Sequence, residues 1–135
     1  MPALKRIVDF LHRQGGLVAA QLHHCGPKAL RRRPRQGLGP LDAEDTAKGE
    51  PPWQPVSASA EASLVGWLQP RSLTIEEIRK LVEDYRQCAR RAAEVPTSTF
   101  WRKMAPTAIC CTRFLSPIAN RRRDAYGGDF NGRLR

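Results

Sequence analysis

The sequence has little of what several large classes of protein require. Aromatic residues make up only 7% of its 135 residues, and they do not interleave with the basic runs. Because sites for single-stranded nucleic acid stack bases on aromatic side chains, such a platform is poorly supported. Long apolar runs are also missing, whereas a membrane-spanning helix needs about 20 apolar residues. We therefore expect no signal peptide and no membrane span, and the expected compartment is cytoplasmic.

Cysteines are few, and their spacing suits neither a metal site nor a redox motif. The four cysteines are Cys25, Cys88, Cys110 and Cys111, and none belongs to a Cys-x-x-Cys pair. Adjacent cysteines are poor metal ligands. We expect free thiols in a reducing compartment and no metal site.

Acidic residues are outnumbered, with 13 Asp and Glu against 23 Lys and Arg, which gives a net charge of +10. Such an excess is compatible with binding to nucleic acid or to an anionic membrane surface. The arginines are clustered at 31–35, 90–91 and 121–123. We expect these clusters on solvated faces and loops and expect no nucleic-acid partner. A basic nucleic-acid-binding module stays open as an alternative.

The N-terminal part predicts a helix followed by a strand. Leu4–Arg13 has apolar residues at helical spacing, and Gly15 and Gly16 are expected to end that helix. Leu17–Leu22 is a short, nearly continuous apolar run, which favours a buried parallel strand. Its polar exception is Gln21, near the carboxyl end of the strand, where parallel α/β folds place their sites.

A long proline- and glycine-rich loop separates this strand from a second helix. Residues 31–72 interrupt every apolar pattern, so we expect a loop with a short hairpin or no regular structure. Leu73–Glu94 then predicts a helix. Thr74 and Glu77 have the spacing of a capping box, and Glu76 and Lys80 are spaced for an ion pair.

Three segments carry more specific patterns. The strand leads into Gln-Leu-x-His-x-Gly-x-Lys, and the loop contains Trp-x-Pro-Val at 53–56 and Gly-Trp-x-x-Pro-Arg-x-Leu-Thr at 66–74. The C-terminal segment has Phe-Leu-Ser-Pro from Phe114 and Asn-x-Arg-x-Asp-x-Tyr-Gly-Gly at 120–128. In this order the three segments resemble the Old Yellow Enzyme family, the FMN-dependent NAD(P)H:flavin oxidoreductases.

The resemblance implies an α/β fold, as a fragment of a TIM (β/α)₈ barrel that covers roughly the third and fourth βα units with a long irregular loop. A whole barrel has about 250 residues. The expected parts are a helix and strand at 1–30, a loop at 31–72, a helix at 73–94, a strand region at 95–112 and a post-strand loop at 113–135. The resemblance starts inside the second βα segment and stops before the fifth strand.

The resemblance also implies a chemistry, in which FMN passes hydride from NAD(P)H to the alkene of an α,β-unsaturated carbonyl compound. Gln21 matches the glutamine whose amide binds the pyrimidine edge of the flavin, an edge that needs a donor and an acceptor. His24 matches a histidine of the same motif and is a candidate for the substrate pocket. His23, Cys25 and Pro27 depart from the usual family residues beside it.

The family's reacting groups are missing from the sequence. Its fourth strand ends in His-x-x-His-Gly-Tyr-Leu, where the paired residues polarise the substrate carbonyl and the tyrosine contacts the substrate or supplies a proton. Counting back from Phe114 puts these positions on Met104, Thr107 and Ile109. None of the three can perform that chemistry, so we assign no catalytic residue.

A shift of reading frame explains the gap. The codons for 104–112, read one nucleotide earlier, permit x-Gly-Ala-His-Gly-Tyr-Leu-Leu-His, and the Gly and the second Leu are forced by the code. Our hypothesis is that 95–112 is an out-of-frame translation between two compensating shifts. A sequencing error, a misplaced intron boundary or a decayed gene would each produce it, and Cys110-Cys111 then has no functional meaning.

These observations lead us to expect an impaired enzyme. The family's first strands and the glycine-rich phosphate loops near strands seven and eight have no counterpart here, so we expect weak or absent FMN binding and marginal stability. A non-catalytic remnant or pseudogene product is the main alternative. The sequence leaves open the physiological substrate, the choice between NADH and NADPH, and the oligomeric state.

Overall fold

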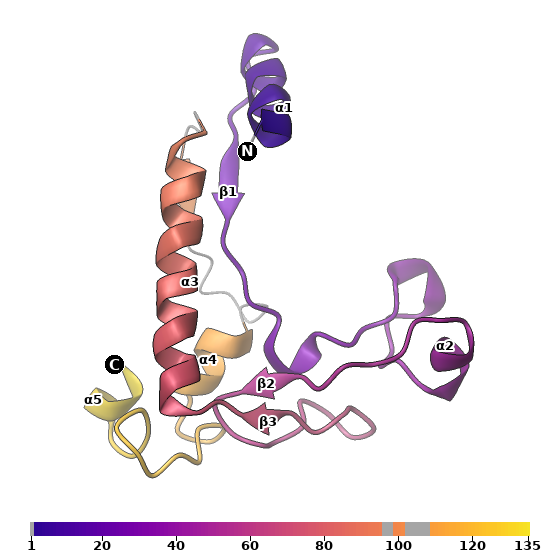
Figure 1. Ribbon diagram of the computed structural model, residues 1–135, viewed down its shortest axis with the longest axis vertical. Helices are drawn as coiled ribbons and strands as arrows, with labels where there is room; N and C mark the ends of the chain where they lie inside the picture. Colours follow the sequence, from indigo (N-terminus) through magenta and orange to yellow (C-terminus); the bar gives the residue numbers. More distant parts are fainter. Residues whose placement is uncertain (1, 96–98, 102–108) are drawn as a thin grey trace. The chain divides into compact units, whose positions relative to one another are not determined.

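A computed structural model of the chain describes residues 2–95, 99–101 and 109–135, with side chains described outside 96–109. The chain divides into two compact units, and Figure 1 labels the helices and strands of both. Unit 1 consists of Met1–His23 and Thr74–Lys103, and unit 2 of His24–Leu73 and Met104–Arg135. Each unit therefore takes two stretches of the chain that are far apart in sequence.

Unit 1 begins with α1, Pro2–Arg13, as the apolar spacing predicts. The helix ends in a Schellman motif, because Gly16 N donates to Leu11 O at 2.9 Å and Gly15 N donates to His12 O at 2.9 Å. Gly15 takes a φ of +77°, which glycine adopts without a steric cost. The predicted glycine stop is thus confirmed.

The sheet of unit 1 pairs β1, Ala19–Gln21, in parallel with β4, Thr99–Trp101. Their register sets Ala19 opposite Thr99 and Gln21 opposite Trp101. The crossover between these parallel strands includes α3, Ile75–Ala93, so that unit 1 contains a βαβ arrangement. The parallel strand predicted over 17–22 forms, but only Ala19–Gln21 pair, and the prediction that it is buried is wrong because Ala19 and Gln21 are exposed.

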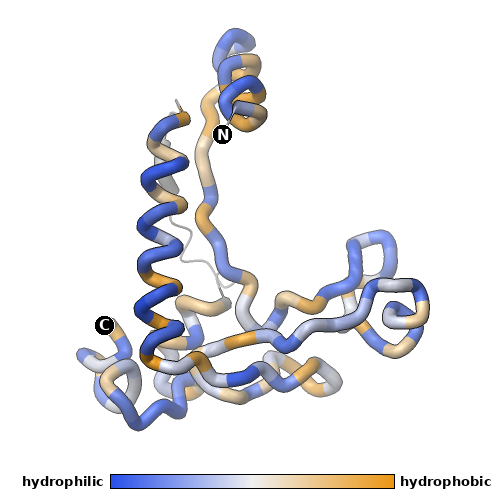
Figure 2. Tube along the Cα trace, viewed as in Figure 1, coloured by the Kyte–Doolittle hydropathy of each residue, from blue (hydrophilic) through white to orange (hydrophobic). Residues whose placement is uncertain are grey.

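Helix α3 confirms the predicted capping box. Thr74 Oγ1 accepts from Glu77 N at 3.2 Å, and the Glu77 carboxylate accepts from Thr74 N at 2.8 Å. Apolar and polar residues alternate along it in Figure 2, and Ile78 and Ala92 are its buried members. The prediction of an ion pair between Glu76 and Lys80 is wrong.

The amine of Lys80 binds Asp84 instead, one turn further along, at 2.8 Å. Glu76 stands in the first turn of α3, where the helix dipole already favours its charge. The ion pair therefore forms on the other side of Lys80, away from the helix N-terminus.

Unit 2 contains more regular structure than the predicted loop. The prediction for 31–72 included a short hairpin, and an antiparallel bridge between Arg31 and Pro40 is present there. The other elements of this stretch are the 3₁₀ turn η2 (Pro34–Gln36), α2 (Ala43–Ala47), and strands β2 (Val56–Ser57) and β3 (Arg71–Ser72), which pair in parallel. The 3₁₀ turn η1 (Gly26–Lys28) precedes the stretch. These elements are two to five residues long, which is too short for periodicity to reveal them.

The C-terminal part of unit 2 also differs from the expected loop. Helix α4 covers Ile109–Leu115, and α5 covers Phe130–Arg133. Asp129 caps α5 by accepting a hydrogen bond from Gly132 N at 2.8 Å. The core of this unit contains buried Leu30, Ala58, Leu73 and Cys110, and Gly26 approaches the backbone of Cys110 closely.

Candidate functional site

Gln21 occupies the carboxyl end of β1, where the sequence predicts the cofactor-binding residue. Its side chain is exposed, and among the described residues it takes part in no hydrogen bond. The parallel register puts Gln21 opposite Trp101, three residues before Met104. The strand that carries the glutamine and the strand that leads to the family's reacting positions therefore end at the same edge of the sheet, which is where barrel enzymes build their sites.

The positions expected to carry the chemistry are not described. Met104 and Thr107 lie outside the described residues, and so does the side chain of Ile109. Most of the stretch 95–112, for which we infer a shifted frame, lies there too.

His24, the candidate for a substrate pocket, belongs to unit 2 and is half-buried. Its Nδ1 accepts a hydrogen bond from Gly26 N at 3.3 Å. Gly26 has a φ of +57°, and an added Cβ would lie 3.1 Å from Cys110 N. The ring thus takes part in the tight turn that starts η1, and this contact gives His24 a structural role.

The cysteines are thiols and not disulfides. Cys25 is exposed, whereas Cys110 is only 1% exposed. Burial raises the pKa of the Cys110 thiol to about 12, because the apolar surroundings disfavour the thiolate. Its burial and its raised pKa both argue against a nucleophilic role for Cys110 at neutral pH. Among the described residues, no group of side chains could hold a metal ion.

Arg122 is the best-connected side chain of the C-terminal motif. Its Nη1 donates to Ala58 O at 2.9 Å and to Leu73 O at 2.6 Å, and its Nε and Nη2 donate to the carboxylate of Asp124. The guanidinium lowers the pKa of Asp124 through these bonds. The sequence predicts the bond between the arginine and the aspartate, but not the contacts with the two distant carbonyls.

Asn120 and Ser59 complete this network, and sequence reasoning missed both. The Asn120 amide donates to Phe114 O at 2.7 Å and to Tyr126 O at 2.8 Å, which closes the loop between them. Ser59 Oγ accepts from Arg121 N at 2.8 Å. Both side chains are buried polar groups with partners, which is what a fixed loop requires. Asn120 is the first residue of the Asn-x-Arg-x-Asp motif, and this position was the signal in the sequence that could have identified it.

Several of the clustered arginines bind carboxylates of the same chain. Arg32 binds Asp45 at 2.8 Å and Asp42 at 2.6 Å, which raises the pKa of Arg32. Arg33 pairs with Glu50. Asp45 is 3% exposed, and its pKa is lowered by the backbone of Asp42 and by Arg32. The expected solvated run at 31–35 is thus partly an internal clamp around α2.

Comparison with known proteins identifies the family that this chain matches. The model of the NADH:flavin oxidoreductase / NADH oxidase family matches residues 1–135. The chain is 35% identical over 135 residues to an NADPH dehydrogenase of Listeria innocua serovar 6a, covering 100% of this chain and 34% of that protein. It is 34% identical over 133 residues to an NADH:flavin oxidoreductase of Gibberella zeae, covering 98% and 32%.

Solved structures agree with the sequence matches. Morphinone reductase superposes with a TM-score of 0.72 at 28% identity, over 96% of this chain and 34% of that one. Morphinone reductase in complex with tetrahydroNAD gives 0.70 at 29% identity, over 97% and 36%. The chain spans about a third of the length of these relatives. No helix among the described residues is long and apolar enough to cross a membrane.

The match over residues 1–135 and the shared fold lead to one conclusion. The chain belongs to the NADH:flavin oxidoreductase family, the Old Yellow Enzyme family of FMN-dependent NAD(P)H oxidoreductases, and represents a fragment of its TIM barrel.

Proposed function

We propose that this chain is the flavin-edge portion of an enzyme that reduces the alkene of α,β-unsaturated carbonyl compounds with NAD(P)H. The observation that carries the proposal is the position of Gln21, exposed at the carboxyl end of β1 and opposite Trp101 of β4. Sites of parallel barrels lie at this end of the strands. Membership of the family supports the reaction class, and the carboxyl end of β1 is the position that we propose for the site.

Gln21 fits the cofactor that the family uses. Its amide offers one acceptor and two donors, which matches the alternating groups of the pyrimidine edge of FMN. FMN, when bound, supplies the transfer of hydride from NAD(P)H to the alkene. The role of Gln21 would be to orient the ring system by that edge. The residues present fit only the pyrimidine edge of FMN, so we expect this chain to bind FMN weakly.

The chain as it stands is, in our proposal, impaired. Met104, Thr107 and Ile109 occupy the positions at which the family polarises the carbonyl and contacts the substrate. A methionine, a threonine and an isoleucine offer no donor pair of that kind. Exposed apolar side chains, among them Leu17 at 89% and Val65 at 103%, also support marginal stability for the isolated chain.

The frame-shift hypothesis accounts for the impairment. The register of β1 and β4 lends it support, because a histidine encoded within 104–107 would follow β4 at the edge where Gln21 lies. Accurate genomic reads over the codons of 95–112 test it directly. Reads that cannot encode Gly-Ala-His-Gly-Tyr in the alternate frame would remove the hypothesis. Reads that confirm both shifts in an expressed gene would favour a remnant or pseudogene product.

Flavin titration of the purified chain tests the cofactor proposal. We expect incomplete quenching of FMN fluorescence at micromolar concentrations and a further loss of affinity in Gln21→Ala. Gln36→Ala, an exposed glutamine of unit 2, is the matched control and should leave the titration unchanged. Equal titrations for the two variants would refute the role of Gln21. A protein purified yellow with stoichiometric FMN would refute the proposed weakness.

A basic nucleic-acid-binding module is disfavoured by the internal pairing of Arg32, Arg33 and Arg122. A guanidinium that is already paired with a carboxylate gains less free energy when it binds a phosphate. Gel shifts with DNA and RNA at increasing salt decide the matter, since phosphate contacts make affinity fall steeply with salt concentration. We expect no salt-dependent shift at micromolar protein, and a steep salt response would restore this alternative.

A further inference from the structure

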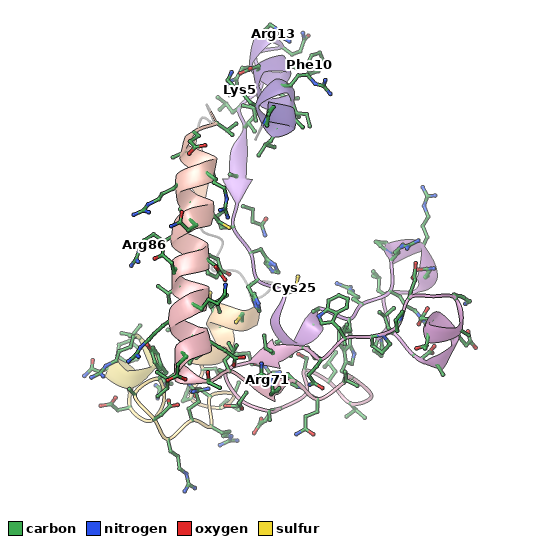
Figure 3. All side chains as sticks on the ribbon, in the orientation of Figure 1. Lys5, Phe10, Arg13, Cys25, Arg71 and Arg86 are labelled. Atoms are coloured by element: carbon green, nitrogen blue, oxygen red, sulfur yellow. The ribbon has the colours of Figure 1, made fainter. Side chains whose placement is uncertain are left out.

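The sequence contains two asparagines, and the structure gives them opposite surroundings. Asn120 is 6% exposed, and its amide donates to the carbonyls of Phe114 and Tyr126. Asn131 is exposed, belongs to α5 and is followed by Gly132. In Figure 3 the side chains of the pale yellow C-terminal segment extend outward from its ribbon. Asn131 is therefore the asparagine whose side-chain amide solvent can reach.

An asparagine that precedes a glycine carries both groups of an intramolecular reaction. The backbone nitrogen of the glycine gives up its proton and attacks Cγ of the asparagine, and the side-chain amide leaves as ammonia. Water then opens the cyclic imide to aspartate or to isoaspartate, in which the main chain runs through the side-chain carboxyl. The overall reaction consumes one water, releases one ammonia and needs no oxidant. A following glycine favours ring closure, because it has no Cβ to restrict the backbone.

In the folded chain the attacking nitrogen is already engaged. Gly132 N donates a hydrogen bond to Asp129 Oδ1 at 2.8 Å, which is the contact that caps α5. The helical turn around Asn131 is closed by a second bond, from Arg133 N to Asp129 O at 3.2 Å. A helical ψ turns the next backbone nitrogen away from the asparagine side chain. The cap and the turn must therefore both open before the imide can form.

Packing requires a glycine at position 132, although a glycine there favours the reaction. A Cβ on Gly132 would overlap the carbonyl oxygen of Gly127. Arg133 holds the same turn in place, because its Nε donates to Leu115 O at 3.0 Å and its Nη1 donates to Gly128 O. A larger residue after Asn131 would thus break the packing, so restraint of the reaction depends on the cap.

We propose that Asn131 is a site of spontaneous deamidation and isomerisation, which the hydrogen bond from Gly132 N to Asp129 restrains in the folded chain. The site consists of an exposed amide, the backbone nitrogen that follows it and the carboxylate that engages this nitrogen. Its co-reactant is water. Deamidation requires neither flavin nor a partner protein, so failure of the proposed cofactor role of Gln21 leaves this site intact.

Isoaspartate at position 131 disturbs the loop that carries the C-terminal motif. It inserts one additional carbon into the main chain before Gly132, whose close approach to Gly127 O leaves no room for a shift. Gly127 in turn approaches the backbone carbonyl of Arg122, whose side chain binds Ala58 and Leu73. Isomerisation therefore lowers the stability of unit 2, whereas deamidation to aspartate leaves the main chain as it is.

Peptide mass spectrometry of the incubated full chain tests the proposal. Trypsin releases the peptide 124–133, and digestion in oxygen-18 water marks any conversion that occurs during the digestion. We expect slow conversion in the native chain and conversion roughly tenfold faster or more in guanidinium chloride, which removes every hydrogen bond of the turn. Asp129→Ala should raise the native rate about fivefold, the effect of one lost hydrogen bond. Asp129→Ser, which keeps a capping oxygen, is the matched control and should retain the slow rate.

Each other result overturns the proposal. Absence of conversion in guanidinium chloride shows that Asn131 is not such a site. Equal rates in the native and the unfolded chain show that the fold does not restrain it. Equal native rates for the chain and Asp129→Ala show that Asp129 is not the restraint. Hydrogen exchange of the Gly132 amide examines the same bond without a substitution, so a variant that fails to fold leaves the test open to refutation: an unprotected amide means that the cap is not formed.

The structural consequence has a test of its own. After prolonged incubation the chain should melt at a lower temperature than it did when fresh, in proportion to its isoaspartate content. Asn131→Gln, incubated in the same way, should keep its midpoint, because the longer side chain does not close the imide ring readily. Equal losses in the two proteins would show that isomerisation at position 131 does not disturb unit 2.

Discussion

The guanidinium of Arg122 binds both oxygens of the Asp124 carboxylate, with Nε 3.0 Å from Oδ1 and Nη2 2.5 Å from Oδ2. Only 8% of the Arg122 side chain is exposed. The remaining nitrogen, Nη1, binds the carbonyls of Ala58 and Leu73, which are 64 and 49 residues away in sequence. A single planar group with five donors thus joins the C-terminal loop to the residues that directly follow β2 and β3.

Replacement of Arg122 by Gln should destabilise unit 2 strongly. Glutamine cannot reach both carbonyls and the carboxylate together, so buried acceptors lose their donors. Loss of one partner from a largely buried charged network costs about 3 kcal/mol. Urea denaturation followed by circular dichroism would measure the change. Arg123→Gln is the control, because Arg123 is exposed and has no partner among the described residues. Equal midpoints for the two variants would contradict this account.

The pair should also make stability depend on pH. Hydrogen bonds from Arg122 lower the pKa of Asp124 in the folded state, so the unfolded chain binds a proton more readily there. The contribution is complete above the ordinary pKa of an aspartate, about 3.9, and is lost as the pH falls through the lower folded value. We expect unit 2 to lose stability below pH of about 4. In Asp124→Asn this part of the pH dependence should disappear, and a variant with an unchanged acid profile would show that the pair does not contribute.

Gly127 should not tolerate a side chain. A Cβ at this position would lie 2.2 Å from the carbonyl oxygen of Arg122, which is backbone and cannot rotate away. Gly127→Ala must therefore shift the loop that holds Arg122, and we expect a loss of about 2 kcal/mol or more. Gly39→Ala is the control, since no atom lies within 4 Å of its added Cβ. A thermal midpoint for Gly127→Ala as high as that of the control would refute the contact.

Local signals in the sequence were sufficient for the long helices. The stripe and glycines of α1, and the Thr74 cap with Glu77 in α3, involve residues at most five positions apart, so chemistry along the chain determines them. Elements of two to five residues were missed because periodicity has no length in which to develop. Helix α2 is one of these, although Asp42 caps it with a hydrogen bond from Glu44 N at 2.9 Å.

The candidate site likewise has features that the sequence predicts and features that it does not. The sequence puts Gln21 at a strand end, and β1 ends at that residue. The contacts of Arg122 with Ala58 and Leu73 could not be predicted, because they depend on how segments about 50 residues apart pack together. Asp45 shows the same limit, since its burial follows from the clamp with Arg32 and not from the composition of an exposed, charged segment.

The four thiols should differ widely in reactivity. Burial raises the pKa of Cys110 to about 12, and the side chain of Cys110 is 1% exposed, whereas Cys25 is exposed. At pH 8 the thiolate form of Cys110 is therefore scarce, and alkylation requires the thiolate. We expect iodoacetamide to label Cys25 first and Cys110 last, at rates at least a hundredfold apart by peptide mass spectrometry. In 6 M guanidinium chloride, which removes burial, the two rates should converge. Rapid labelling of Cys110 in the native protein would mean that this thiol is accessible, and the packing of Gly26 against Cys110 would then have to be abandoned.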